Sequence, residues 1–122
     1  MDSINITRLV NNTGESIEVC VLYDKPYLDS LKLMSYEGFL KQSAERADQF
    51  LISIDTMVAS VTYKVAKNQT IDAFHGSGSE PDFRAIHSVT VRSVKGTSVY
   101  SRNIISQSLA KQGSGFWEWV IK

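Results

Sequence analysis

The sequence predicts a mainly β protein, either an antiparallel β-sandwich or a partly open barrel, with about seven or eight short strands and one short helix. Short runs in which apolar and polar residues alternate recur along the chain, and this period of two is typical of half-buried strands. Turn signals rich in Gly, Asn and Ser separate the runs. Only one stretch has the apolar spacing of a helix. The alternative is an α+β fold, in which an antiparallel sheet packs on that helix.

The clearest signal is the stretch from Phe83 to Ile105, which predicts a β-hairpin. Its first arm alternates, and the residues expected on one face are Ala85, His87, Val89 and Val91. Its second arm, Val99 to Ile105, is rich in β-branched and aromatic residues. Gly96, in the short break between the arms, can take the positive φ that a tight reversal needs.

The N-terminal part predicts a second hairpin. Ser3 to Val10 and Ser16 to Tyr23 both alternate, and Asn11 to Glu15 between them contains the Asn and Gly residues of a reversal. The sequence Asp24-Lys25-Pro26 then ends the pattern, because proline cannot donate a hydrogen bond to a strand ladder.

The next stretch predicts the single helix, over roughly Tyr36 to Asp48. Apolar residues repeat there at helical spacing, at Leu40, Ala44, Ala47 and Leu51. No β-branched residue lies between Glu37 and Gln49. Leu28 to Met34 is left open as a short strand before the helix.

The remaining sequence predicts further strands and two polar segments. The strands are expected at Phe50–Ile54, Met57–Ala66, Thr70–His75 and Phe116–Ile121. Gly76 to Asp82 is the longest loop signal, with no apolar side chain, and Ser106 to Gly115 is polar and turn-like. No repeat or linker divides the sequence, so residues 1–122 are expected to form one domain.

Size and charge narrow the classes of function. With 122 residues, the chain can bury a core without a disulfide or a metal. Thirteen basic side chains cancel thirteen acidic ones, which removes the positive excess that nucleic-acid binding needs, so no nucleic-acid partner is expected. Cys20 is the only cysteine, so no internal disulfide can form, and we expect it to be a small buried hydrophobic residue.

The sequence predicts neither a signal peptide nor a transmembrane segment. Asp2, Asn5 and Arg8 interrupt the N-terminal segment, where a signal peptide needs an unbroken apolar run. No other apolar run approaches membrane-spanning length. The chain as given is therefore expected to be soluble, and cytoplasmic unless it is exported by a route without a signal peptide.

Two aromatic groups are candidate ligand-binding sites. In the last strand, alternation places Trp117 and Trp119 on one face, which either fills the core or stays open as a ligand groove, a membrane-contacting patch or a subunit interface. The second group lies around Asp24, and its tyrosines can stack on a sugar or on a choline-like headgroup. Its candidate binding residues are Tyr23, Asp24, Tyr27 and Tyr36, with Phe39 beside them.

The sequence gives little support to catalysis. His75 and His87 are the only histidines, and His75 and Asp72 point to opposite faces of a strand because they are three positions apart. The Gly-Ser segment after His75 lacks the Lys and the helix start of a phosphate-binding loop. We therefore expect no catalytic residue, no metal site and no cofactor.

These expectations combine into two hypotheses of function. The plan of the chain is similar in general character to small sandwich lectins and membrane-recognising cytolysins, which is an analogy of architecture alone. It implies a non-enzymatic binding module for a carbohydrate or a membrane lipid headgroup. The alternative is a protein-interaction or structural subunit, such as an inhibitor, an immunity factor or an assembly component. That subunit would associate through the C-terminal aromatic strand as an exposed edge or face, with a homo-oligomer as one outcome.

Overall fold

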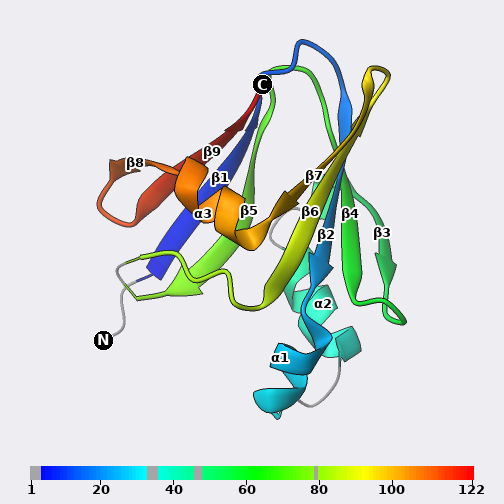
Figure 1. The fold of residues 1–122 in the computed structure, drawn as a ribbon, viewed down its shortest axis with the longest axis vertical. Coiled ribbons are helices and arrows are strands. Elements are labelled where there is room, and N and C mark those ends of the chain that lie inside the picture. The colour runs from blue at the N-terminus through cyan, green and yellow to red at the C-terminus, as the bar shows by residue number, and fades with distance from the viewer. Residues whose placement is uncertain (1–3, 33–35, 46–47, 79) are drawn as a thin grey trace.

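The computed structural model describes residues 4–32, 36–45, 48–78 and 80–122, and these form a β-sandwich of two sheets (Figure 1). In spatial order, the four-stranded sheet contains β5 (Thr70–Ser77), β1 (Ile4–Asn11), β9 (Phe116–Ile121) and β8 (Ala110–Gly113). The five-stranded sheet contains β3 (Leu51–Asp55), β4 (Ser60–Val65), β2 (Ile17–Tyr23), β6 (Ile86–Ser93) and β7 (Gly96–Ser101). Neighbouring strands are antiparallel except β1 and β9, which run parallel. The prediction of a mainly β sandwich is confirmed.

The helices of the described residues are short. They are α1 (Lys25–Ser30), α2 (Tyr36–Glu45), α3 (Arg102–Ser108) and the 3-10 helix η1 (Asp48–Phe50). The helix predicted over Tyr36 to Asp48 is confirmed as α2, in which Leu40 and Ala44 are buried. Residues 46–47 lie outside the described part of the chain.

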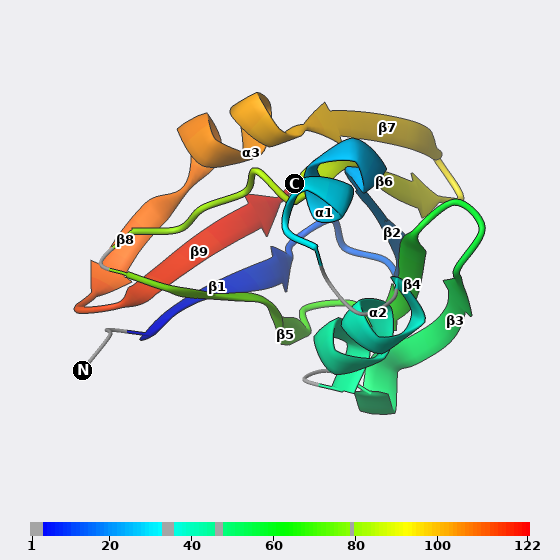
Figure 2. The ribbon, with the colours of Figure 1, turned by 90° about the horizontal axis from the view of Figure 1, so that it is seen from below.

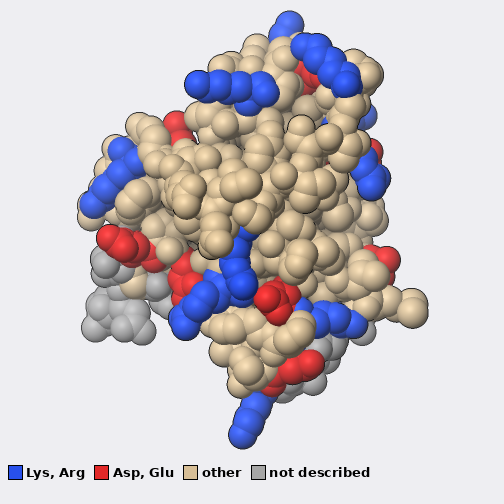
Figure 3. Space-filling view, in the orientation of Figure 1, with Lys and Arg blue, Asp and Glu red and all other residues tan. Residues whose placement is uncertain are grey.

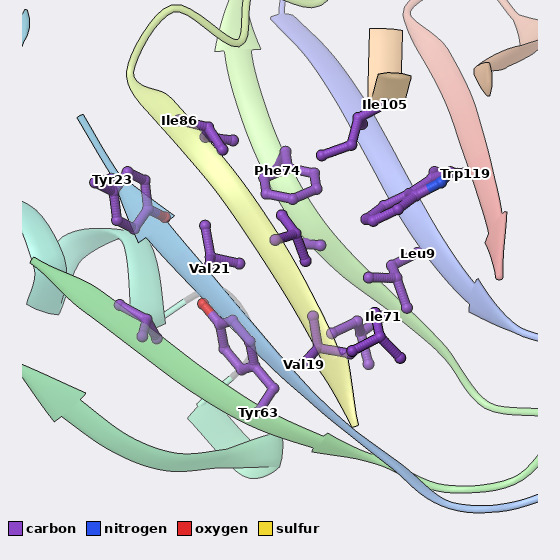
Figure 4. Packing of buried hydrophobic residues seen from close by; sticks show 14 of the residues in the cluster. Leu9, Val19, Val21, Tyr23, Tyr63, Ile71, Phe74, Ile86, Ile105 and Trp119 are labelled. Carbon is purple, nitrogen blue, oxygen red and sulfur yellow. The ribbon is translucent and has the colours of Figure 1, made fainter. Parts of the chain in front are cut away.

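The core lies between the inward faces of the two sheets (Figure 4). Large buried side chains meet there from both sheets, namely Leu9, Ile71 and Trp119 from one and Val19, Val21 and Tyr63 from the other. Burial of each such side chain stabilises the fold by about 1.5–3 kcal/mol. The sandwich is therefore held chiefly by apolar contact between its sheets.

Two connections cross between the sheets at the upper end of Figure 1. The first connection joins β1 to β2. These strands belong to different sheets, so the prediction of an N-terminal hairpin from Ser3–Val10 and Ser16–Tyr23 is wrong. The second connection runs from β4 to β5, beside the first. The buried Asn11 amide ties it to β1, because this amide donates to Val65 O (3.1 Å) and Ala66 O (3.0 Å). Alternation identifies each strand, but it does not say which sheet the strand joins.

The helix α1 forms where the sequence predicts only a break. Asp24 caps it, because its carboxylate accepts a hydrogen bond from Tyr27 N (3.1 Å). Pro26 lies in the first turn, where a missing N–H breaks no helical hydrogen bond. Leu28 is buried in this helix, so the strand left open at Leu28–Met34 does not begin there; residues 33–35 lie outside the described structure.

The helix α3 ends the Phe83–Ile105 hairpin earlier than predicted. The hydroxyl of Ser101 accepts from Ile104 N (3.3 Å) and caps the helix, while Ile105 is buried. Figure 2 shows α3 bridging from β7 to β8, and α3 packs against β6, β7 and β9. The turn-like prediction for Ser106–Gly115 is therefore only partly right, because it contains the end of α3 and all of β8.

A β-bulge in β6 changes which side chains face the core. β2 pairs with residues 86 and 88 of β6 and skips His87. Ile86 is consequently buried beside Val89, and His87 is exposed, so the predicted shared face of His87 and Val89 is wrong. Cys20 lies half-buried on the outer face of the sheet and is not the buried core residue expected.

Two loop boundaries also differ from the predictions. Met57 is 82% exposed in the turn before β4, so the strand predicted from Met57 begins at Ser60. Gly76, predicted to open the long loop, is still part of β5. The loop that follows is held to β1, because the buried Asn5 amide donates to Gly78 O (3.2 Å) and Glu80 O (2.9 Å).

Candidate functional site

The two tryptophans of β9 do not form an open aromatic face. Trp119 is 2% exposed and packs edge-on against Tyr100, with ring centroids 5.3 Å apart. Trp117 is half-buried, and the Lys111 ammonium lies 5.6 Å from the centroid of its ring. Trp119 is therefore a core residue, which is one of the alternatives that the sequence left open. A ligand could reach only part of the Trp117 ring.

The strand β9 is not a sheet edge, so of the exposed edge or face that the interaction hypothesis allows, only a face remains. β1 pairs with one side of β9 and β8 with the other. What β9 offers a partner is its outer face, where Phe116 is 40% exposed and Arg8 lies over its ring at 5.2 Å.

Asp24 and Tyr27 lie in a surface network of charged groups. Besides capping α1, Asp24 pairs with Arg102 (3.3 Å), and Arg102 also donates to Arg84 O (2.9 Å). Arg84 lies over the Tyr27 ring at 5.6 Å and pairs with Asp82 (2.6 Å). These contacts give Asp24 and Tyr27 structural partners before any ligand is considered.

The pKa of Asp82 is shifted within this network. The side-chain hydrogen bonds from Arg84, and then the bond from the Arg84 backbone N–H, hold the pKa of the Asp82 carboxyl below its ordinary value of 3.8. Asp82 is therefore ionised at neutral pH.

Tyr23 lies inward of this surface network, in the interior of the sandwich. It is buried at the end of β2, and its ring meets that of Phe39 edge-to-face with centroids 5.2 Å apart. Figure 4 shows Tyr23, Ile86 and Phe74 directed into the space between the sheets. The side chain of Tyr36, the remaining predicted residue, lies outside the described structure.

A pocket of about 210 Å³ opens beside Tyr23, at the end of the sandwich that carries α1 and α2 (Figure 2). Two aromatic pairs line it: Tyr23 with Phe39, and Phe74 with Phe83, whose ring centroids are 5.5 Å apart. Its polar lining residues are Gln42, Ser43, His75 and Asp82. We call this the aromatic pocket.

Of the five predicted ligand-binding residues whose side chains the structure describes, only Tyr23 lines the aromatic pocket. Phe74 lies at an irregularity in the pairing of β5 with β1, and Phe83 follows the long loop. Nothing in their local sequence connects either ring with Tyr23, because the three meet only through the packing of the two sheets. Among the lining residues that the structure describes, Phe39 is the other one that the sequence grouped with Tyr23.

The pocket can hold a small group against aromatic rings, with polar atoms available for hydrogen bonds. Among the described residues, no group of three or more His, Cys, Asp or Glu side chains could hold a metal ion. In the same part of the chain, none of the helices has the length and hydropathy to span a bilayer.

The chain has no match among protein-family models, curated proteins or solved structures.

Proposed function

We propose that this protein is a non-enzymatic binding module whose aromatic pocket takes a quaternary ammonium group, as found in a choline-type lipid headgroup. The observation that carries the proposal is the set of four aromatic rings lining one small pocket. Aromatic faces attract a methylated ammonium through the ring quadrupole, and the attraction grows when the group leaves water.

The pocket suits a headgroup better than a sugar. Sugars stack on an open aromatic platform, whereas Tyr23, Phe74 and Phe83 of this pocket are buried. The volume of about 210 Å³ is below the roughly 300–1,000 Å³ of pockets that hold drug-sized ligands, so the occupant is one compact group.

Charge also favours a zwitterionic lipid over an anionic one. In the face drawn in Figure 3, basic and acidic side chains lie side by side below a wide uncharged area. Anionic membranes attract clusters of Lys and Arg, and the charged groups beside the aromatic pocket are instead paired, as in Asp82 with Arg84. The ionised Asp82 carboxylate lines the pocket, so an ammonium group bound there has a negative charge nearby. Arg84 pairs with Asp82 and balances that negative charge.

The test fills the pocket without deleting a core residue. Ser43 lines the pocket from α2 and is half-buried, so Ser43→Leu should occupy its space. The matched control is Ser114→Leu in the exposed turn before β9. Binding is measured by calorimetry with phosphocholine and by cosedimentation with phosphatidylcholine and phosphatidylglycerol vesicles.

We expect wild type and Ser114→Leu to bind phosphocholine and phosphatidylcholine vesicles, and Ser43→Leu to lose both. If wild type binds neither probe, or if a folded Ser43→Leu binds as wild type does, the proposal is wrong. Methyl glycosides tested in parallel identify the carbohydrate alternative, which would appear as sugar binding blocked by Ser43→Leu.

Phe116 favours a second candidate function, a protein-interaction subunit. A 40% exposed aromatic ring under Arg8 on the outer face of β9 is the kind of anchor that protein interfaces use. Light scattering tests self-association directly: a dimer that Phe116→Ser converts to a monomer supports this function. A concentration-independent monomer removes self-association through this face.

A further inference from the structure

A second cleft lies at the opposite end of the sandwich from the aromatic pocket. It encloses about 260 Å³ between the β1–β2 connection, the outer part of the β6–β7 hairpin and the end of β9, at the top of Figure 1. Its lining includes Glu15, Tyr100 and Lys95, together with the hydroxyl residues Thr13, Ser93 and Thr97. We call it the Glu15 cleft.

Glu15 is presented by a fixed turn. The buried Asn11 amide donates to Glu15 O (2.8 Å), and Thr13 N donates to Asn11 Oδ1 (3.1 Å). Gly14 has φ +87°, a left-handed conformation that glycine takes without strain. These bonds fix the backbone on both sides of Gly14. Little backbone ordering is therefore needed when a ligand binds to Glu15.

The Glu15 carboxylate lacks a hydrogen-bond donor for one of its oxygens. Its Oε1 is buried, and no residue in the described part of the chain donates to it. A buried carboxylate oxygen without a donor is costly, by about 1–3 kcal/mol or more. As the side chain lies in the structure, this oxygen is closed off from the cleft, so a donor in the cleft removes that cost only when the Glu15 side chain turns outward.

The surrounding groups select the chemistry of this donor. Lys95 and Lys122 line the same cleft, and Figure 3 shows mainly basic side chains at this end of the molecule, so a cation is disfavoured. Glu15 itself disfavours an anion. A neutral polyhydroxyl ligand avoids both penalties, because its hydroxyls donate to Glu15 and its oxygens accept from the hydroxyl groups and Lys95.

We infer that the Glu15 cleft is a binding site for a neutral sugar ring, with Glu15 accepting a hydrogen bond from a ligand hydroxyl and Tyr100 contacting the ring. This site does not depend on the aromatic pocket. The protein would then carry a headgroup site at one end of the sandwich and a sugar site at the other.

The test uses the full chain and a pair of isosteric variants. Glu15→Gln keeps the shape of the side chain and removes its charge, and Glu18→Gln makes the same change at an exposed residue of β2 three positions away. The probes are the methyl glycosides of glucose, mannose and galactose, titrated into isotope-labelled protein and followed by NMR. Thermal melting checks that both variants are folded.

We expect at least one glycoside to shift resonances of Glu15, Thr97 and Tyr100, and Glu15→Gln to weaken that binding by roughly tenfold or more. Glu18→Gln should bind as wild type does. The inference is overturned if none of the glycosides binds, or if Glu15→Gln binds as tightly as wild type does. Phosphocholine binding measured on the same samples shows separately whether the aromatic pocket functions.

Discussion

The two ends of this sandwich are built from different chemistry. At the end with α1 and α2, Tyr23 and Phe39 meet Phe74 and Phe83 around the aromatic pocket. At the other end, the chain crosses twice between the sheets and leaves a polar cleft around Glu15. Helices can close a sandwich with apolar side chains, whereas closely spaced crossings expose backbone groups that need polar partners.

The two ends are therefore stabilised in different ways. Asn11 is fully buried and satisfies carbonyls of both crossing connections, so the polar end depends on hydrogen bonds. The aromatic end depends on ring packing that extends from the core to the pocket lining. Three substitutions test this contrast.

The largest effect is expected from Phe74→Ala at the aromatic end. Phe74 is buried and packs against Phe83, and a Phe-to-Ala change of this kind costs about 4 kcal/mol of unfolding free energy. Urea unfolding gives the value. Phe116→Ala, at an exposed ring, should cost far less, and equal losses at the two positions would contradict the packing described for this end.

A smaller but still large effect is expected from Asn11→Ala at the polar end. It leaves Val65 O, Ala66 O and Glu15 O without the donor they share, at a cost of about 3 kcal/mol. The exposed neighbour gives the control, since Asn12→Ala should change stability by no more than about 0.5 kcal/mol. Similar urea midpoints for the two variants would show that hydrogen bonds do not hold the crossings.

The smallest effect concerns Asp82 and pH. Its folded-state pKa lies below 3.8, so its contribution to stability is complete above that value and is lost as the pH falls through the lower folded-state pKa. The side chain is 44% exposed, which limits the loss to under about 1 kcal/mol. Asp82→Asn should remove this part of the acid dependence in urea unfolding series. Identical acid profiles for Asp82→Asn and wild type would contradict the pairing with Arg84.

The fold class could be predicted from sequence because alternation is a local property. Val61, Tyr63 and Val65 show it: they alternate along the strand predicted at Met57–Ala66, and each is buried. The signals for α1 and α3 were also local, since Asp24 precedes Pro26 and Ser101 begins a helix, but they lay within stretches interpreted as a break and a strand.

Pairing and bulges could not be predicted in the same way. The extra residue His87 changes which side chains of β6 face the core. This bulge is visible only in the pairing of β6 with β2, and not in the sequence of β6. The aromatic pocket could be predicted only in part, for the same reason. Tyr23 and Phe39 could be grouped because they are close in sequence, whereas Phe74 and Phe83 join them only when the two sheets pack together.

The decisive experiment on the aromatic pocket is an NMR titration of the isotope-labelled full chain with phosphocholine. We expect saturable shifts of the resonances of Tyr23, Phe39, Ser43 and Phe83, with those of Glu15 and Thr97 unchanged. Absence of binding, or shifts centred on the Glu15 cleft, would contradict the assignment of the quaternary ammonium site to the aromatic end.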